Sequence, residues 1–137
     1  MLIFNKTIEI FISIQIIIIS TFVPVFISIP FKNKLIQTLD LPITWQVPCI
    51  IVITLIFNGR TVITAFSLYL IIGLFFIPVF HQGGSLGYLM TPNFGYLLGT
   101  YPLIKIIDNL NNRNNLNIGN FLKNGFLAIG AMHFTGI

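Results

Sequence analysis

The chain has 137 residues, of which 55% are hydrophobic and only 7% are charged, whereas soluble domains carry roughly 25% charged residues. This composition excludes an ordinary soluble enzyme and indicates an integral membrane protein with a single domain, residues 1–137. The net charge of +4 comes from isolated lysines and arginines without the basic clusters of nucleic-acid-binding proteins. We therefore expect membrane lipid, and no nucleic acid, as a partner.

The first apolar run covers residues 8–29 and is interrupted by Pro24. It is long enough to cross a hydrocarbon core of about 30 Å, so we predict a first spanning helix with a kink at Pro24. A cleavable signal peptide is the alternative because Lys6 precedes the run, but the run is too long and no small-residue cleavage site follows it. Residues 30–46 mix charged residues and prolines with apolar ones and are predicted to form a loop.

Two further apolar runs, residues 47–58 and 61–80, are separated only by the turn sequence Asn58-Gly59-Arg60. This pattern predicts a helical hairpin whose short first arm is tilted or partly re-entrant. Cys49 lies in the first arm and is the one cysteine of the chain. It has no disulfide partner and no metal-ligand spacing, so we expect a small core residue.

Residues 78–99 are rich in glycine and hold Gly83, Gly84, Gly87, Gly95 and Gly99. Glycine permits turns and close approach to the backbone, and the prolines at either side remove helix donors. Irregular backbone in a membrane protein is tolerated mainly where it lines a cavity or is buried in protein. This stretch is therefore the first place to look for a binding site.

The end of the chain alternates apolar and polar stretches. Residues 94–107 predict a fourth span, in which Gly95, Gly99 and Pro102 would permit close packing and a kink. Residues 108–120 are rich in asparagine and predict a solvated connector. A fifth apolar run begins near Phe121 and is expected to be incomplete at Ile137, as in a truncated chain. The expected fold class is an all-α bundle of transmembrane helices with about five spans.

The distribution of basic residues predicts the orientation in the membrane. With a cytoplasmic N-terminus, five of the seven lysines and arginines lie inside, as the positive-inside rule requires. Lys32 and Lys34 are the two outside. The loop at residues 30–46 and the glycine-rich loop then both face outward. The location predicted is the plasma membrane, with several passes.

The outward side carries neutral polar and aromatic side chains that suit a small, mostly uncharged solute. No carboxylate pair, metal-ligand pattern, catalytic triad or phosphate loop is present, so we expect no enzyme, cofactor or metal. For His81 the alternative to ligand binding is a structural hydrogen bond, and for His133 it is packing against another helix. For Trp45, Tyr88 and Tyr96 it is an aromatic belt at the membrane interface. The candidate ligand-binding residues are Thr44, Gln46, Gly83, Gly84, Gly87, Tyr88, Pro92, Asn93, Gly95 and Tyr96.

The order of motifs resembles the BioY family, the biotin-binding S components of energy-coupling-factor (ECF) transporters. Pro78-Val79-Phe80, the glycine-rich loop, Met90-Thr91-Pro92-Asn93-Phe94-Gly95-Tyr96 and upstream Leu41-Pro42-Ile43-Thr44-Trp45-Gln46 carry the resemblance. It implies six spans, capture of biotin at the outer face, and uptake driven by ATP hydrolysis in coupling and ATPase subunits.

Two features depart from the family pattern. The Pro-Gly-Asp element and lysine of the family's last span have no counterpart before Ile137, and no alanine occurs before Ala65 to form the usual docking face. Without that element and that lysine, residues 1–137 are expected to bind biotin weakly or not at all. The alternatives are a degenerate, non-binding BioY fragment or a structural or accessory subunit of another membrane complex.

Overall fold

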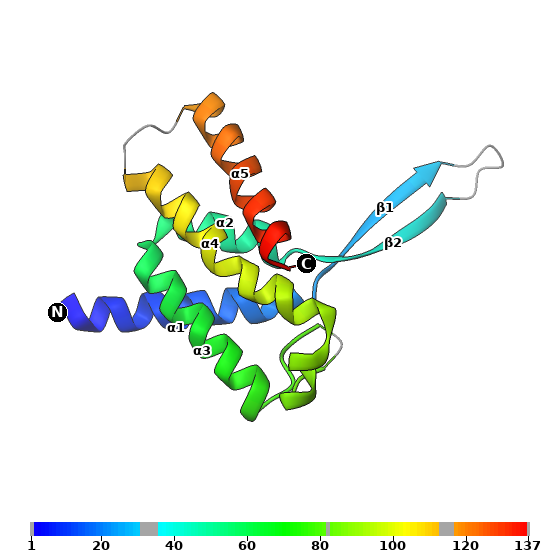
Figure 1. Ribbon diagram of the computed structural model, residues 1–137, viewed down its shortest axis with the longest axis horizontal. Coiled ribbons are helices and arrows are strands. Elements are labelled where there is room, and N and C mark those ends of the chain that lie inside the picture. The colour runs from blue at the N-terminus through cyan, green and yellow to red at the C-terminus, as the bar shows by residue number, and fades with distance from the viewer. Residues whose placement is uncertain (1, 31–35, 82, 113–116, 137) are drawn as a thin grey trace.

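The computed structural model describes residues 2–30, 36–81, 83–112 and 117–136. They form a bundle of helices from which a two-stranded hairpin projects (Figure 1). None of the described helices is both long and apolar enough to cross a membrane. The elements are α1 (Leu2–Thr21), β1 (Pro24–Pro30), β2 (Ile36–Thr44), α2 (Gln46–Ile56), α3 (Gly59–Phe75), the 3₁₀ helix η1 (Leu86–Met90), α4 (Pro92–Asn112) and α5 (Ile118–Gly136).

The hairpin corrects two predictions. The helix expected over residues 8–29 ends at Thr21, and β1 begins at Pro24 because proline disfavours helix at the preceding residue and lacks an N–H. Most of the loop expected at residues 30–46 is β2, and residues 31–35, with Lys32 and Lys34, lie outside the described residues. The all-α prediction therefore holds for the bundle and not for this segment.

The hairpin is antiparallel with an irregular base. Pro24 pairs with Thr44, and Phe26 pairs with Asp40. Val25 of β1 therefore lies opposite three residues of β2, residues 41–43. An unpaired bulge of this kind accommodates the missing N–H of a proline in β2. The hairpin ends at a backbone hydrogen bond of 3.1 Å from Trp45 N–H to the Val23 carbonyl, which brings the end of α1 beside the start of α2.

The turn predicted between the second and third apolar runs is confirmed. Asn58 is the N-cap of α3, and its side chain accepts a hydrogen bond of 3.1 Å from the Arg60 N–H. The Gly59 N–H donates to Asp108 Oδ1 of α4 at 2.8 Å. A carboxylate at a helix N-terminus is favourably placed for the helix dipole. Asp108 thus ties the start of α3 to α4.

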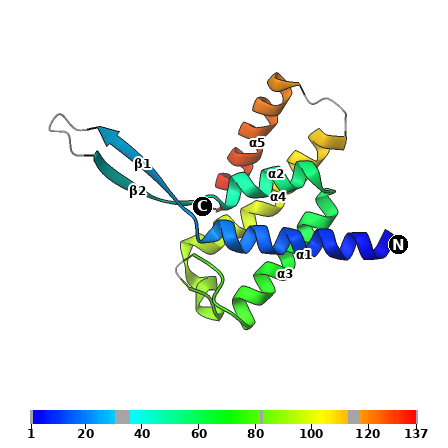
Figure 2. The same ribbon diagram turned by 180° about the vertical axis from the view of Figure 1, so that it is seen from behind.

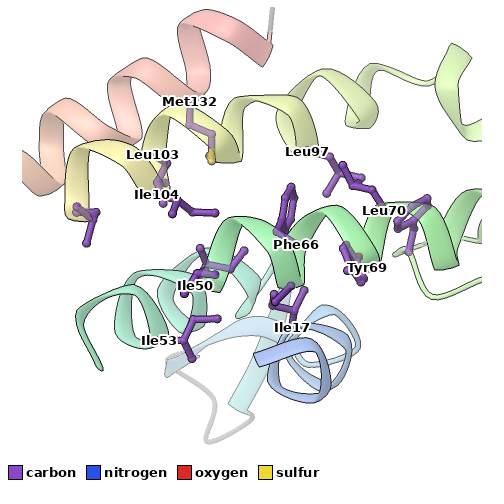
Figure 3. Packing of buried hydrophobic residues seen from close by; sticks show 14 of the residues in the cluster. Ile17, Ile50, Ile53, Phe66, Tyr69, Leu70, Leu97, Leu103, Ile104 and Met132 are labelled. Carbon is purple, nitrogen blue, oxygen red and sulfur yellow. The ribbon is translucent and has the colours of Figure 1, made fainter. Parts of the chain in front are cut away.

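The core lies on both sides of α3. Phe66 is fully buried and points from α3 toward α4, while Ile17 of α1 and Ile53 of α2 lie on the other side of α3 (Figure 3). On α1, Ser13, Ile17 and Thr21 are spaced four residues apart and are all buried, so they form one face of the helix. Figure 2 shows α1 crossing the bundle on the side opposite α5. Cys49 of α2 is free and half-buried.

The C-terminal half of the bundle differs from the sequence prediction at its connector. Residues 108–112 continue α4 and α5 begins at Ile118, so most of the connector expected at residues 108–120 is helical; residues 113–116 lie outside the described part. Leu110 is 5% exposed, and its burial together with the Asp108 contact offsets the low helix propensity of the asparagines. Pro92 begins α4, a position that suits proline.

Candidate functional site

The chain leaves α3 at Phe75 and folds back onto the same helix. Phe80 and Gly83 exchange two backbone hydrogen bonds of 3.0 and 3.1 Å, and the Ser85 N–H donates to the Gly73 carbonyl at 3.0 Å. A Cβ on Gly84 would lie 2.5 Å from Pro78 Cα and 2.7 Å from the Gly73 carbonyl oxygen. The close approach at Gly84 is therefore to the chain itself.

Two of the described residues of this loop have positive φ. Gly83 has φ +130°, which glycine adopts freely. Ser85 has φ 83° and ψ 171°, a region that is nearly restricted to glycine and costs of order 1–3 kcal/mol. Gly87, in contrast, has only the Ser85 hydroxyl within 4 Å of an added Cβ, at 3.8 Å. The three glycines of the loop thus have different roles: a turn, a close approach and an open position.

A buried tyrosine hydroxyl lies under this loop. Tyr69 of α3 is fully buried, and its hydroxyl lies 3.2 Å from Thr21 Oγ1 and 3.5 Å from the Val79 carbonyl. The side chain of Gln46 lies beside the same hydroxyl. The Nε2 atom of Gln46 is buried and makes no hydrogen bond with a described residue. A buried amide donor without a well-aligned hydrogen bond is unusual in folded proteins.

A second tyrosine extends this arrangement toward the surface. The Phe80 ring lies between Tyr69 and Tyr88, with centroid distances of 5.3 and 4.7 Å. The Tyr88 hydroxyl donates to the His81 carbonyl at 3.3 Å, and the Asn93 side chain lies beside it. Burial raises the pKa of Tyr88, while the Asn93 amide partly opposes the rise. The hydroxyl therefore stays protonated, and a donor, at neutral pH.

We call Thr21, Gln46, Tyr69, Tyr88 and Asn93 the tyrosine cluster. These five residues come from α1, α2, α3, η1 and α4. Thr21 and Gln46 lie at the Tyr69 hydroxyl, Asn93 lies at the Tyr88 hydroxyl, and the Phe80 ring joins the two tyrosines. Three of the ten candidate residues belong to it: Gln46 lies beside Tyr69, and Asn93 lies beside Tyr88.

The other candidate residues lie at its edge or elsewhere. Thr44 lies at the base of the hairpin, two positions before Gln46, and Pro92 lies at the start of α4 beside Asn93. The Tyr96 ring instead meets the His133 ring of α5 edge to face at 5.4 Å. Gln82 lies outside the described residues.

Gly95 and Gly99 bring α4 against α5. A Cβ on Gly95 would lie 2.7 Å from the Gly136 carbonyl oxygen, and one on Gly99 would meet the Met132 carbonyl oxygen. Such contact explains why small residues occupy these positions, and the predicted close packing at both is confirmed. Gly95 and Gly99 therefore face α5 and not the tyrosine cluster.

Sequence reasoning missed two members of the cluster, Tyr69 and Thr21. A tyrosine is the most polar large side chain in the middle of the apolar run at residues 61–80, and a buried tyrosine usually finds a hydrogen-bond partner. That rule marks Tyr69 as a candidate. No signal in the sequence pairs it with Thr21, which lies 48 positions earlier.

Comparisons with known proteins identify the family. A model of the BioY family matches residues 5–137, and the chain belongs to that family. The probable biotin transporter BioY of Lysinibacillus sphaericus is 35% identical over 79 residues, which are 58% of this chain and 37% of that protein. The matched stretch thus spans little more than a third of the relative. Membership in the family implies a membrane location. No solved structure matches the chain.

Proposed function

We propose that the protein is a biotin-binding membrane subunit that captures biotin at the outer face of the plasma membrane. Delivery into the cell would use an energy-coupling-factor module with a transmembrane subunit and ATPase subunits, and this chain would hydrolyse nothing. The observation that carries the proposal is the tyrosine cluster, in which Gln46 presents a buried amide donor without a partner. Family membership and the biotin transporter relative support the same function.

The chemistry of the cluster fits the ureido ring of biotin. That ring is flat, has two N–H donors and one carbonyl acceptor, and is otherwise apolar. The Gln46 amide supplies a donor for the carbonyl, and Asn93 and Tyr88 supply polar groups nearer the surface. The apolar faces of Phe80 and the two tyrosines provide the low-polarity surroundings in which a few hydrogen bonds determine orientation.

Because Tyr69 is fully buried, we assign it a positioning role behind the binding face. Its hydroxyl bonds Thr21 and lies beside the Gln46 side chain, so its removal would change the polar surroundings of that amide. Of the loop glycines, Gly83 and Gly84 shape the backbone that carries Tyr88, and Gly87 is open to a ligand. Thr44, Pro92, Gly95 and Tyr96 complete the proposed site at its margins.

Biotin binding to the purified protein in detergent, measured by isothermal titration calorimetry, tests the proposal. Asn93→Ala and Tyr88→Phe should each weaken binding by about tenfold, or about 1.4 kcal/mol. Asn109→Ala is the matched control because Asn109 is also an exposed asparagine of α4 and lies outside the cluster. Absence of any biotin binding by the parent protein would contradict biotin capture by residues 1–137. Unchanged affinity in both cluster variants would contradict the site.

The proposed orientation places the N-terminus in the cytoplasm. The start of α3, the end of α4 and the start of α5 lie away from the hairpin and from the loop that carries η1 (Figure 1). Arg60 and Lys123 lie near two of these ends, which agrees with the positive-inside rule. Arg113 lies outside the described residues.

Cysteine labelling tests this orientation. In a Cys49→Ser background, Met90→Cys should react with a membrane-impermeant maleimide added outside, because Met90 is 93% exposed and lies in η1 on the outward side. Arg60→Cys, exposed at the start of α3, is the matched control and should react only after the membrane is permeabilised. The reverse pattern would contradict the orientation and with it capture from outside.

A second candidate function is that of a structural or accessory subunit. It is favoured by the packing of Gly95 and Gly99 against α5, which needs no ligand. The calorimetric experiment separates the two functions, because an accessory subunit has no reason to bind biotin through Asn93 and Tyr88.

A further inference from the structure

A groove lies between the C-terminal part of α4 and α5. Its volume is about 940 Å³. It shares no residue with the tyrosine cluster. Its lining comes from Ile106, Asn109, Leu110, Asn120, Lys123, Asn124, Phe126, Leu127, Gly130, Ala131 and Phe134.

The groove exists because the two helices touch at one end and diverge toward the other. At the touching end, Gly95 and Gly99 meet the backbone of α5 near Gly136 and Met132. Toward the end of α4 and the start of α5 the helices spread apart, as both Figures 1 and 2 show. The lining residues of α4, Ile106 to Leu110, belong to this diverging half.

The lining changes from polar to apolar along the groove. Asn120, Lys123 and Asn124 lie in the first two turns of α5, and Leu127, Gly130, Ala131 and Phe134 follow on the same face at helical spacing. The rise of 1.5 Å per residue places Lys123 about 16 Å from Phe134 along the axis, which is close to the length of a long acyl chain. A cationic end with an apolar tail is the complement of an anionic amphiphile.

The charge at the polar end has no counterpart in the described part of the protein. Lys123 forms no ion pair with a described residue, and none of the residues that line the groove is acidic. A second copy of the chain, or an apolar helix, would bury this ammonium group without an anion, which is costly. An anionic headgroup would neutralise it while remaining hydrated at the wide end.

Gly130 lines the groove and leaves space there because it has no side chain. An added Cβ on Gly130 would have no atom within 4 Å, so the fold does not require glycine there. Phe126 and Phe134, one turn on either side, are 75% and 86% exposed. An acyl chain lying across Gly130 would be covered on both sides by these two rings.

We propose that this groove binds one anionic phospholipid. Its phosphate lies at Lys123 with the neighbouring asparagine amides, and one acyl chain runs past Gly130 to Phe134. Under the proposed orientation the polar end of the groove faces the cytoplasmic leaflet. Anionic lipids are enriched in this leaflet, and basic pockets between helices bind their headgroups there.

Native mass spectrometry of the delipidated protein tests the proposal. Phosphatidylglycerol should be bound in preference to phosphatidylcholine with the same acyl chains by about fivefold, the value expected for one lysine facing one anionic headgroup. Lys123→Gln should abolish this preference. Lys105→Gln is the matched control because Lys105 is exposed on α4 and does not line the groove. Inorganic phosphate in excess should not displace the lipid, because the acyl chain also contributes.

A second pair of variants tests the acyl chain. Gly130→Leu should reduce the occupancy of both lipids, whereas Gly125→Leu should not, because Gly125 is equally open but does not line the groove. Equal binding of the two lipids by the parent, or equal effects of Lys123→Gln and Lys105→Gln, would overturn the proposal. A change of oligomeric state in Gly130→Leu with unchanged lipid binding would assign the groove to a second copy and overturn it as well.

Discussion

Replacing Tyr69 by Phe isolates the hydroxyl at the centre of the tyrosine cluster. The ring contacts with Phe66 and Phe80, at 5.7 and 5.3 Å between centroids, remain. The hydrogen bond of 3.2 Å with Thr21 is lost, but Thr21 keeps its bond of 2.7 Å to the Ile17 carbonyl. The Val79 carbonyl also loses its contact of 3.5 Å with the hydroxyl. No hydroxyl is left without a partner, so we expect a loss of about 1 kcal/mol in the free energy of unfolding.

Tyr101→Phe is the matched control. The Tyr101 hydroxyl bonds Ser67 Oγ at 2.9 Å, Ser67 also donates to the Ile63 carbonyl at 2.9 Å, and the Tyr101 ring packs on Phe66 at 5.4 Å. Both variants should therefore lower the melting temperature in detergent by a similar amount, about 3–5 °C. Tyr101 is outside the cluster, so its replacement should leave biotin affinity unchanged.

Calorimetry with biotin separates the two variants. Tyr69→Phe should weaken binding by at least about threefold, or roughly 0.7 kcal/mol, because the Gln46 amide loses the group beside it. If both variants weaken binding equally, the effect follows general stability and the positioning role of Tyr69 is refuted. If Tyr69→Phe binds like the parent, the buried hydroxyl has no influence on the site.

Three predictions concern stability, each measured by thermal unfolding in detergent. Gly99→Ala should destabilise by about 1–3 kcal/mol because its Cβ meets the α5 backbone, whereas Gly125→Ala should stabilise by up to about 1 kcal/mol; effects of equal sign would contradict the packing. Ser85→Gly should stabilise by about 1 kcal/mol by relieving the positive φ, and no gain would show that the backbone is unstrained. Asp108→Ala should cost about 1–2 kcal/mol because the Gly59 N–H loses its acceptor, and a neutral result would show that water replaces the carboxylate.

The helices of the bundle were predictable, and their ends were only partly so. An apolar run in the sequence marked every described helix longer than ten residues. The same pattern does not distinguish a buried helix from a strand, so the change from α1 to β1 at Pro24 was missed. The extension of α4 depends on Asp108 and Leu110, whose partners lie in other elements. Contacts of that kind cannot be read from local composition.

The candidate site was predictable where a motif carried it. Gln46, Tyr88 and Asn93 were selected from short motifs, and the structure brings them to one cluster. Tyr69 was missed because it stands alone in an apolar run. The glycines were treated alike in the sequence, but Gly84 faces its own loop, Gly87 faces open space and Gly99 faces α5. Only the distances from each glycine to its neighbours separate these roles.

The length of the β1–β2 hairpin does not determine the positions of the polar groups in the tyrosine cluster. Thr21 and Gln46, which flank it, both approach the Tyr69 hydroxyl, and the pairing of Pro24 with Thr44 closes the intervening chain at its base. Closing a free loop of this size would cost about 3 kcal/mol of chain entropy, which the strand pairing offsets before any ligand arrives. Residues added or removed at the far end of the hairpin change the entropy of loop closure only logarithmically. Variation in hairpin length among related chains is thus compatible with one conserved arrangement of polar groups at its root.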